Sequence, residues 1–411
     1  MKVMLGLLWG CLALTGWTAG AERSKLSPAF PQPATAYDFR KLRRERLGRG
    51  VFAFRRTNDV VRVAWRYKSS DPDTIAFNVY RDGYRVNKKP ITDVTWFDDR
   101  FAWDGQKHVW EVCPLVKSGK VRREKGAFWR LGAKAPVGYF DIELNPPAPG
   151  KTPDGREYSY YPCDCSVGDL DGDGEYELVV IWWPTLAHDN SHGGQTGETW
   201  LEGVKLDGTN RSLWKICLGP NIRAGAHYSP VIVWDLDGDG VAEVVCRTAD
   251  GTRDGTGRLL VGGVFDKKVR PFKDGRAEDA HVVFAPNYTT VFGGRTGQAL
   301  DTIPFVPPVL DDAAAIAAKD YKAVNKKWKS RAAGNQAFRF LSAVGYFDGV
   351  RPSVVLCRGY YSDTYLTAYD WNGKKLVKRW QFVADDEHNP TYKGQGFHNL
   401  RVGDVDFDGR D

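Results

Sequence analysis

The fold of this chain follows from one run of residues, Gly168-Asp169-Leu170-Asp171-Gly172-Asp173-Gly174-Glu175-Tyr176-Glu177, which leads directly into the apolar segment Leu178-Val179-Val180-Ile181. Aspartates at alternate positions, a glutamate at the ninth position and glycines that allow a tight turn supply the oxygen ligands that a hard cation such as Ca²⁺ prefers. The loop differs from an EF-hand, because its last acid comes at the ninth position and an apolar strand follows in place of a helix. We therefore predict a cation loop at the entrance to a β-strand.

The same pattern returns further along the chain. Asp235 to Glu243 leads into an apolar strand, Asp404 to Asp411 repeats the acidic run, and Gly345 to Gly349 is a reduced version with one acid. A unit that recurs at strand entrances is the signature of a repeat protein. The predicted Ca²⁺ ligands of the three acid-rich loops, for which a merely solvated turn is the alternative, are Asp169, Asp171, Asp173, Glu177, Asp235, Asp237, Asp239, Glu243, Asp404, Asp406 and Asp408.

A further run of oxygen-bearing side chains alternates in the same way. It comprises Asp250, Thr252, Asp254 and Thr256. Carboxylates and hydroxyls at alternate positions suit another cation loop, with a plain polar turn as the alternative.

From residue 137 onward, each acidic loop is paired with an apolar strand, a glycine turn and another apolar strand, as in Val204 to Trp214 and Val291 to Leu300. One such set in roughly 60 residues is what the blades of a β-propeller require. We expect an all-β fold in which residues 137–411 form a partial propeller of about four to five blades. Helix is expected only between Asp311 and Lys329, as an insertion between blades.

The N-terminal third has a different composition. Residues 1–21 combine Lys2, an apolar run and the small residues Ala19-Gly20-Ala21, which is typical of a signal peptide and predicts a secreted or periplasmic protein. Residues 22–45 are read as a linker. Short alternating strands with aromatic residues over 46–136 predict a small β-sandwich of the immunoglobulin or fibronectin type.

The charge of the chain limits its possible partners, and its cysteine content limits how the fold is stabilised. The chain has 58 Lys and Arg against 51 Asp and Glu, a net charge of +7, and no basic run interleaved with aromatics, so nucleic acid is not expected. A modest positive field suits an acidic polysaccharide. No second apolar run is long enough to cross a bilayer, so we expect no membrane partner, and we expect a monomer. Six cysteines outside the leader are too few for a disulfide framework, so the core must supply the stability.

Several motifs resemble the rhamnogalacturonan lyases of polysaccharide lyase family eleven. They are Gly168 to Gly174, Asn221-Ile222-Arg223-Ala224-Gly225-Ala226-His227-Tyr228, Thr248 to Gly257, Arg358-Gly359-Tyr360-Tyr361 and Gly394-Gln395-Gly396-Phe397-His398-Asn399-Leu400, together with Ile75 to Arg81 in the sandwich. The resemblance runs from about residue 45 to the last residue. It implies a calcium-rich, eight-bladed propeller behind a small β-sandwich.

The chain departs from the family pattern at two places. Where the family usually has Gly-Asn-Arg-x-Asp-Arg, this chain reads Gly334-Asn335-Gln336-Ala337-Phe338-Arg339. The chain also ends at Asp411, before the ninth-position acid of its last loop. An eight-bladed ring would leave open strand edges at that point, so we expect the remaining blades to be missing from this sequence.

The chemistry implied by the resemblance is β-elimination at rhamnosyl-(1→4)-galacturonate bonds of rhamnogalacturonan I. Such a reaction needs positive charge on the uronate carboxylate, a base near C5 and a proton donor near O4. The residues carried over for catalysis are Arg223, His227, Tyr228 and His398, and those carried over for substrate binding are Arg358, Tyr360, Tyr361 and Asn399. For each of them a packing or bracing role is the alternative.

Two other functions remain open at this point. A non-catalytic propeller of the FG-GAP type that only binds carbohydrate or protein would use the same loops for structure. A lyase or hydrolase that acts on a different polyuronate would share the basic site.

Overall fold

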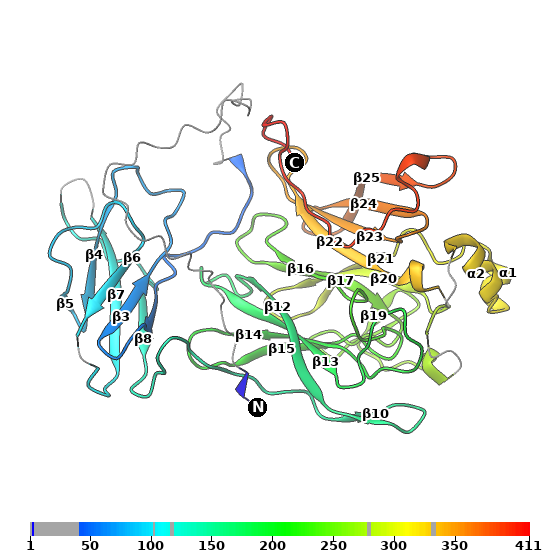
Figure 1. Cartoon of the computed structure of the whole chain (residues 1–411), viewed down its shortest axis with the longest axis horizontal. Coiled ribbons are helices and arrows are strands. Elements are labelled where there is room, and N and C mark those ends of the chain that lie inside the picture. The colour runs from blue at the N-terminus through cyan, green and yellow to red at the C-terminus, as the bar shows by residue number, and fades with distance from the viewer. Residues whose placement is uncertain (1, 4–40, 102, 116–118, 278–280, 330–333) are drawn as a thin grey trace. The chain divides into compact units, whose positions relative to one another are not determined.

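The computed structural model describes residues 2–3, 41–101, 103–115, 119–277, 281–329 and 334–411 (Figure 1). The architecture is all-β with little helix, as predicted. The chain divides into two compact units, one of residues 1–42, 48–143 and 403–411 and one of residues 43–47 and 144–402. Among the described residues, no helix is long and apolar enough to cross a membrane. Of the predicted signal peptide, residues 1 and 4–21 lie outside the described residues, as do residues 22–40 of the predicted linker.

The smaller unit contains two antiparallel sheets that share one core. A three-stranded sheet has the order β2-β3-β6 and a four-stranded sheet the order β5-β4-β7-β8, while β1 pairs with β9. Alternating apolar residues of both sheets, such as Val63 and Val112, are fully buried between them, which explains the alternation in the sequence. The strands are β1 (Lys2–Val3), β2 (Phe52–Arg55), β3 (Val60–Ala64), β4 (Ala76–Arg81), β5 (Tyr84–Arg85), β6 (Trp96–Arg100), β7 (His108–Leu115), β8 (Phe128–Leu131) and β9 (Ile142–Glu143).

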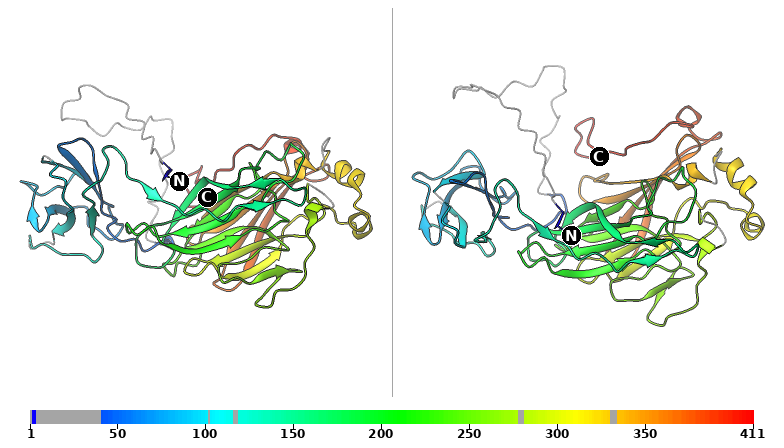
Figure 2. Two further views of the ribbon diagram at one scale, coloured as in Figure 1. Left: turned by 90° about the horizontal axis from the view of Figure 1, so that it is seen from below. Right: turned by 60° about the horizontal axis from the view of Figure 1, so that its bottom comes forward.

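The larger unit contains three four-stranded antiparallel sheets. Their strand orders are β12-β13-β14-β15, β16-β17-β20-β21 and β22-β23-β24-β25 (Figure 2). The strands are β12 (Tyr160–Gly168), β13 (Glu177–Pro184), β14 (Trp200–Val204), β15 (Ser212–Cys217), β16 (Val231–Trp234), β17 (Glu243–Ala249), β20 (Asn287–Gly293), β21 (Ala299–Pro304), β22 (Phe340–Gly345), β23 (Ser353–Arg358), β24 (Thr364–Trp371) and β25 (Leu376–Ala384).

The middle sheet is buried on both faces. In β17 all seven residues are buried, because Val244 and Cys246 join the core shared with the first sheet while Val245 joins the core shared with the third. Consecutive side chains of a strand point to opposite faces, so this sheet must lie between two partners. The three sheets therefore pack face to face in the order of the sequence.

Short elements connect the sheets. The predicted helical insertion is present as α1 (Ala313–Ala317) and α2 (Tyr321–Trp328), each capped at its N-terminus by an aspartate, Asp312 and Asp320. Two small hairpins are formed by β10 (Gly150–Lys151) with β11 (Glu157–Tyr158) and by β18 (Leu259–Val261) with β19 (Val264–Asp266), and single 3-10 turns lie at η2 (Gly275–Ala277), η3 (Asn335–Phe338) and η4 (Pro390–Tyr392).

Of the prediction of an all-β partial propeller, only the all-β fold with little helix is confirmed. The described residues of the larger unit form three four-stranded antiparallel sheets, against the four to five blades expected, and none of the described sheets closes on itself. The ring arrangement stays a prediction.

Candidate active site

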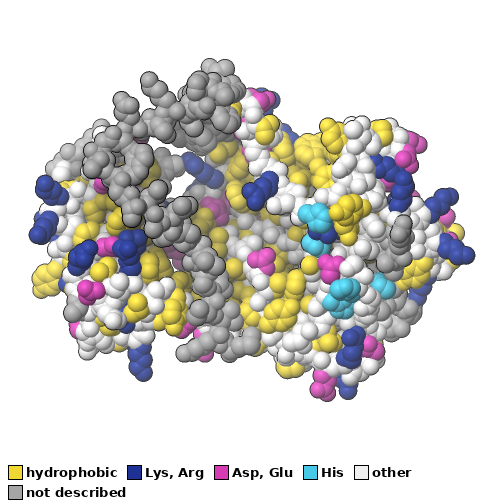
Figure 3. Space-filling view, viewed as in Figure 1, with side chains coloured by type: hydrophobic (Ala, Val, Ile, Leu, Met, Phe, Trp, Pro, Cys, Tyr) yellow, Lys and Arg dark blue, Asp and Glu magenta, His cyan; other side chains and the backbone are white. Residues whose placement is uncertain are grey.

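The acidic loops and the basic candidate residues lie at opposite ends of the sheets. Residues 169–176 join β12 to β13, and residues 235–242 join β16 to β17. Residues 223–228 precede the first strand of a sheet, residues 359–361 follow a second strand, and His398 follows a fourth strand. In an antiparallel meander these last three positions share one end, and the link from first to second strand lies at the other. The acidic loops 169–176 and 235–242 therefore brace strands away from the basic side chains. Histidine side chains gather on one face of the larger unit (Figure 3).

Arg223 organises the first part of the basic cluster. Its guanidinium is 3% exposed and donates to His188 Nε2 (2.7 Å), to the hydroxyl of Tyr228 and to the carbonyls of His192 (2.9 Å) and Gly194 (3.0 Å). Because arginine only donates, His188 accepts at Nε2, and its Nδ1–H donates to the Leu186 carbonyl (2.8 Å). Burial and this neighbouring guanidinium help lower the pKa of His188. Arg223 thus holds His188 as a neutral ring.

His227 projects from the same loop with an unusual backbone. Its φ is +75°, in the left-handed region that non-glycine residues seldom adopt, and such strain concentrates at functional sites. Its Nε2 lies 3.7 Å from Asp189 Oδ2. Burial and the positive charge of Arg339 lower its pKa, whereas Asp189 opposes that shift. A half-buried histidine that is neutral near neutral pH can accept a proton.

His398 links the second part of the cluster. Arg339 donates to its Nδ1 (2.9 Å), and its Nε2 lies 3.1 Å from the Tyr361 hydroxyl. Since Nδ1 must accept, Nε2 carries the proton and donates to Tyr361, which leaves the tyrosine hydroxyl able to donate onward. Tyr361 is 53% exposed and has a φ of +50°, and Arg339 stacks on the ring of Tyr360 at 4.5 Å.

The structure corrects the roles predicted for Tyr360, Arg358 and Tyr228. Tyr360 is 7% exposed and its ring is covered by Arg339, so it supports that arginine and does not contact a sugar. Arg358 is fully buried among aromatic rings such as Phe340, and it donates to the carbonyls of Ala337 (2.9 Å) and Pro307 (2.7 Å), so it braces the core and does not reach a substrate. The hydroxyl of Tyr228 accepts from Arg223, so it positions that arginine, and because Tyr228 is only 1% exposed it does not reach a sugar.

The remaining predicted residues are placed as follows. Asn399 lies next to His398 on the same exposed segment. The two cavities of about 270 and 260 Å³ in this unit, one lined by Phe305 and the other by Lys273, do not include His227 or His398. The cluster therefore lies outside these two cavities.

Sequence reasoning gave no role in this cluster to three of its members: His188, Asp189 and Arg339. The first two lie in a polar run after β13 that reads as an ordinary loop. Arg339 is the last residue of the segment 334–339, which departs from the family pattern. It matches the last arginine of that pattern, and this match was the signal that could have identified it. Their proximity to His227 and His398 depends on long-range packing of loops from different sheets.

The second acidic loop has the donor set that Ca²⁺ prefers. Ligand oxygens of Asp235, Asp237 and Asp239 lie within 4.8 Å of one another. The loop is shaped by backbone amides that donate to Asp235 from Gly238 (2.7 Å) and Gly240 (2.9 Å). Burial, together with the charges of the neighbouring aspartates, raises the pKa of Glu243 to about 8, and a divalent cation would stabilise its charged form. The residues present fit a cation here.

The last acidic loop, in the smaller unit, has a similar shape. Ligand oxygens of Asp404, Asp406 and Asp408 lie within 4.8 Å of one another, and the amide of Gly409 donates to Asp404 Oδ2 (2.8 Å). Oxygen atoms grouped in this way fit a hard cation.

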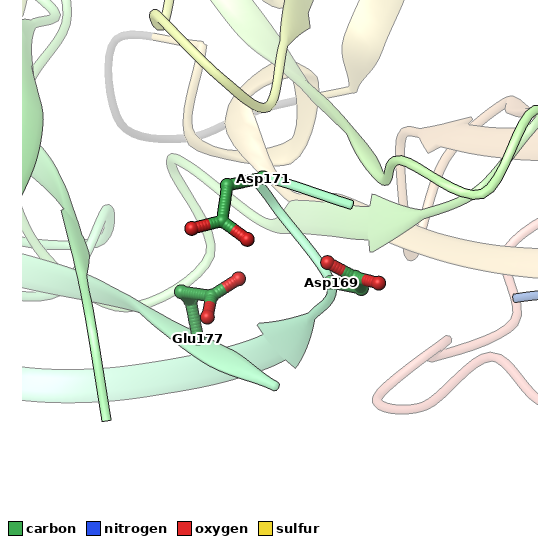
Figure 4. Close-up of side chains that lie close together, drawn as sticks. All are labelled: Asp169, Asp171 and Glu177. Carbon is green, nitrogen blue, oxygen red and sulfur yellow. The ribbon is translucent and has the colours of Figure 1, made fainter. Parts of the chain in front are cut away.

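The first acidic loop differs, because an ammonium group lies within it. Figure 4 shows the carboxylates of Asp169, Asp171 and Glu177 grouped near the start of β13. Lys205 Nζ lies 2.8 Å from Asp171, 2.6 Å from Asp173 and 2.8 Å from Glu177. Burial raises the pKa of Glu177 to about 7, against the lowering effect of Lys205.

The predicted ligand set of Asp250, Thr252, Asp254 and Thr256 is not brought together. The Thr252 hydroxyl donates to the Leu218 carbonyl (2.9 Å), and Asp250 accepts from the amide of Gly262 (2.8 Å). Asp254 pairs with Arg258 (2.7 Å) and accepts from the Thr256 hydroxyl (2.8 Å). These side chains stabilise turns, so we no longer assign a cation to them.

Comparison with known proteins agrees with this architecture. Residues 139–411 match the C-terminal domain of rhamnogalacturonan lyase family 11, and residues 42–128 match the β-sheet domain of rhamnogalacturonan I lyases. The chain is 42% identical over 373 residues to rhamnogalacturonan exolyase YesX of Bacillus subtilis (strain 168), covering 90% of this chain and 56% of that protein. It is 39% identical over 369 residues to rhamnogalacturonan endolyase YesW of the same strain, covering 89% and 54%.

Solved structures give the same result. The crystal structure of YesX superposes with a TM-score of 0.75 at 40% identity, covering 90% of this chain and 56% of that one. The Bacillus licheniformis rhamnogalacturonan lyase superposes with the same TM-score and identity, covering 90% and 58%. This sequence spans little more than half the length of these relatives. The match over its greater part shows that the chain belongs to rhamnogalacturonan lyase family 11.

Proposed function

We propose that the protein is a polysaccharide lyase that cleaves rhamnosyl-(1→4)-galacturonate bonds of rhamnogalacturonan I by β-elimination. The relatives named above are a rhamnogalacturonan exolyase and a rhamnogalacturonan endolyase, and this chain shares their family. The observation that carries the proposal is the cluster of His227, Tyr361, His398 and Arg339, drawn from loops of different sheets, with Asp189 as its carboxylate. A basic surface with a neutral histidine and a tyrosine suits an anionic sugar substrate.

Elimination from a uronate makes two demands of the site. The proton on C5 is weakly acidic while the neighbouring carboxylate is ionised, so positive charge must first offset that carboxylate. Arg339 and Arg223 supply a fixed positive field at this end of the sheets. A base then removes the C5 proton, the bond between C4 and O4 breaks, and a C4=C5 double bond forms while O4 takes a proton.

We assign the proton transfers to the two groups best placed for them. His227 is the proposed base, because Arg339 and burial keep its ring neutral. Tyr361 is the proposed acid, because its hydroxyl receives a hydrogen bond from His398 and its side chain is exposed. Arg223 and Tyr228 are positioning residues that hold the loop of His227, and Tyr360 supports Arg339, while Asn399 is assigned to sugar contacts.

Calcium is proposed as a structural cofactor. Asp235, Asp237, Asp239 and Glu243 would hold one ion, and Asp404, Asp406 and Asp408 would contribute to another. Bound calcium supplies charge compensation that fixes a strand entrance. We further propose that the protein is secreted or periplasmic, since residues 1–21 have the pattern of a signal peptide, and that it works as a monomer.

The test is an assay of the purified protein on rhamnogalacturonan I, followed by the ultraviolet absorbance of unsaturated products. We expect products from the unmodified protein and at least about a hundredfold loss of kcat in His227→Ala and in Tyr361→Phe. Lys322→Ala, at an exposed position of α2, is the matched control and should retain full activity. Reducing-sugar release without ultraviolet absorbance would show a hydrolase. Sugar binding without any cleavage would show a carbohydrate-binding protein.

A further inference from the structure

In the larger unit, the loop that joins the first and second strands of a sheet carries acidic side chains, and the surroundings of these acids differ from sheet to sheet. The first and second acidic loops have nearly the same backbone. Leu170 N donates to Glu177 (2.8 Å) as Leu236 N donates to Glu243 (2.9 Å). The amides of Gly172 and Gly238 each donate to the first aspartate of their loop at 2.7 Å. The same scaffold therefore presents the same carboxylates twice.

The two loops differ in the residue that the neighbouring strand places beside them. In the first sheet Leu178 pairs with Val204, so Lys205 follows at the level of Glu177. In the second sheet the residue that pairs with Glu243 is Gly293, which has no side chain. An arginine donates to a backbone carbonyl in both loops, Arg295 to Asp171 and Arg46 to Gly238, so that contact does not distinguish them.

Lys205 fills the centre of the first loop completely. An ammonium has three N–H donors, and three carboxylates lie at 2.6 to 2.8 Å from Nζ, which uses all of them. The lysine side chain is 7% exposed and Glu177 is 1% exposed, so the pair is shielded from water. A divalent ion contacts oxygens at about 2.3 to 2.6 Å and would need the space that Nζ occupies. Expelling a buried ammonium from its three partners would be costly.

The third sheet supports this interpretation. Its reduced loop keeps Asp348, which pairs with Arg351 (2.8 Å) and lies 3.5 Å from Arg379, and Asp370 also pairs with Arg379 (3.2 Å). Asp370 pairs with Ser353 on the strand ladder, the position that corresponds to Lys205 and Gly293. In the third sheet, the guanidinium groups of Arg351 and Arg379 therefore balance the charge of the aspartates, and the loop has no cluster of acids.

We propose that the first loop is completed by the ammonium of Lys205 and takes no divalent cation, so that in the larger unit only the second loop depends on a metal. The sequence pattern assigned calcium to both loops alike, and the structure disagrees for the first. The charge that a metal ion brings to the second loop is supplied in the first by a residue of the chain itself.

The first experiment compares the two loops in the unmodified protein. Amide hydrogen exchange is followed for residues 169–177 and 235–243 with Ca²⁺ and with a chelator. We expect the chelator to raise exchange in 235–243 by at least about tenfold and to leave 169–177 unchanged. An equal rise in both loops, or an anomalous-scattering peak for Ca²⁺ within 169–177 in crystals, would overturn the proposal.

The second experiment changes the residue that differs between the two loops, Lys205 beside the first and Gly293 beside the second. Lys205→Met removes the ammonium, and we expect native mass spectrometry to show one more bound Ca²⁺ per chain. Gly293→Lys is the reciprocal variant, and a Cβ there would meet only ordinary contacts with Leu300 at 3.5 Å. It should bind one Ca²⁺ fewer. Lys215→Met, which removes a lysine of the same sheet that donates to the Asn145 carbonyl (2.7 Å), is the matched control.

Unchanged stoichiometry in both exchanged variants would contradict the proposal. Neither measurement requires lyase activity, so its failure and the failure of the proposed function are distinguishable. If Lys205→Met does not fold, the exchange comparison in the unmodified protein still decides the question.

Discussion

His227 experiences opposite charges from Asp189 and Arg339, and its proton affinity decides whether it can act as a base. Burial and Arg339 lower its pKa from the ordinary value of 6.5. A base must be deprotonated, so kcat/KM should be constant at neutral pH and fall as the pH drops through a value below 6.5. Asp189→Asn removes the group that raises this pKa, so the acid limb should move lower still. A pH–rate profile of the unmodified protein and of Asp189→Asn measures the position of the acid limb. A limb above pH 6.5, or a limb that does not move in Asp189→Asn, would contradict the assignment of His227 as the base.

Glu124 supplies the clearest acid-sensitive contact of the smaller unit. Burial alone would raise its pKa, but hydrogen bonds from Arg49 (2.8 Å) and Lys68 (3.0 Å) lower it to about 2 from 4.5. The stability that it contributes is therefore complete above pH 4.5 and is lost as the pH falls from there toward 2. We expect Glu124→Gln to reduce the free energy of unfolding by about 1 to 3 kcal/mol at neutral pH and by less in acid.

Urea denaturation at neutral pH and at about pH 3, followed by tryptophan fluorescence, measures this difference. Asp73→Asn, an exposed acid of the same unit, is the control. A loss of stability that is equal at both pH values would show that the effect of Glu124→Gln is packing and not charge.

At the scale of an element, the α2 helix packs through two fully buried side chains, Val324 and Trp328, of which Trp328 is the larger. Trp328 is fully buried, its indole N–H donates to the Val309 carbonyl (2.8 Å), and its ring packs edge-on against Tyr365. Trp328→Ala should cost about 3 to 5 kcal/mol, because it leaves a large cavity. Ile316→Ala, on α1 and 38% exposed, should change stability by less than about 0.5 kcal/mol. Chemical denaturation of the two variants tests the contrast, and equal effects would mean that α2 is not anchored by its tryptophan.

At the scale of the whole molecule, we expect stability to depend on calcium. The second loop ties β16 to β17, and the latter strand lies in the sheet that is buried on both faces. A ligand that binds only the folded state adds about 2.7 kcal/mol at a concentration one hundred times its Kd. A chelator should therefore lower Tm, and excess Ca²⁺ should restore it. Calorimetry measures these changes in Tm, and Asp237→Asn serves as a variant of lower calcium affinity. A Tm that does not change when the chelator is added would contradict a structural role for the ion.

The sequence by itself determined the elements of this protein. Alternating apolar residues between glycine turns predicted an all-β chain, the run Asp311 to Lys329 predicted the helical insertion, and acids at alternate positions predicted the tight loops at strand entrances. These features are local, since a period of two residues or a turn of ten residues is set by neighbours in the chain.

Only the tertiary structure decided which side chains meet. It buried Arg358 and Tyr228 in the core, joined Arg339 to His398 across 59 residues of sequence and placed Lys205 in a loop whose first acid lies 36 positions earlier. Such contacts arise from the register between strands and the packing between sheets, which a linear pattern does not encode. Two loops of nearly the same sequence therefore differ in chemistry, because a lysine directly follows the strand beside the first loop, whereas the strand beside the second loop ends in a glycine.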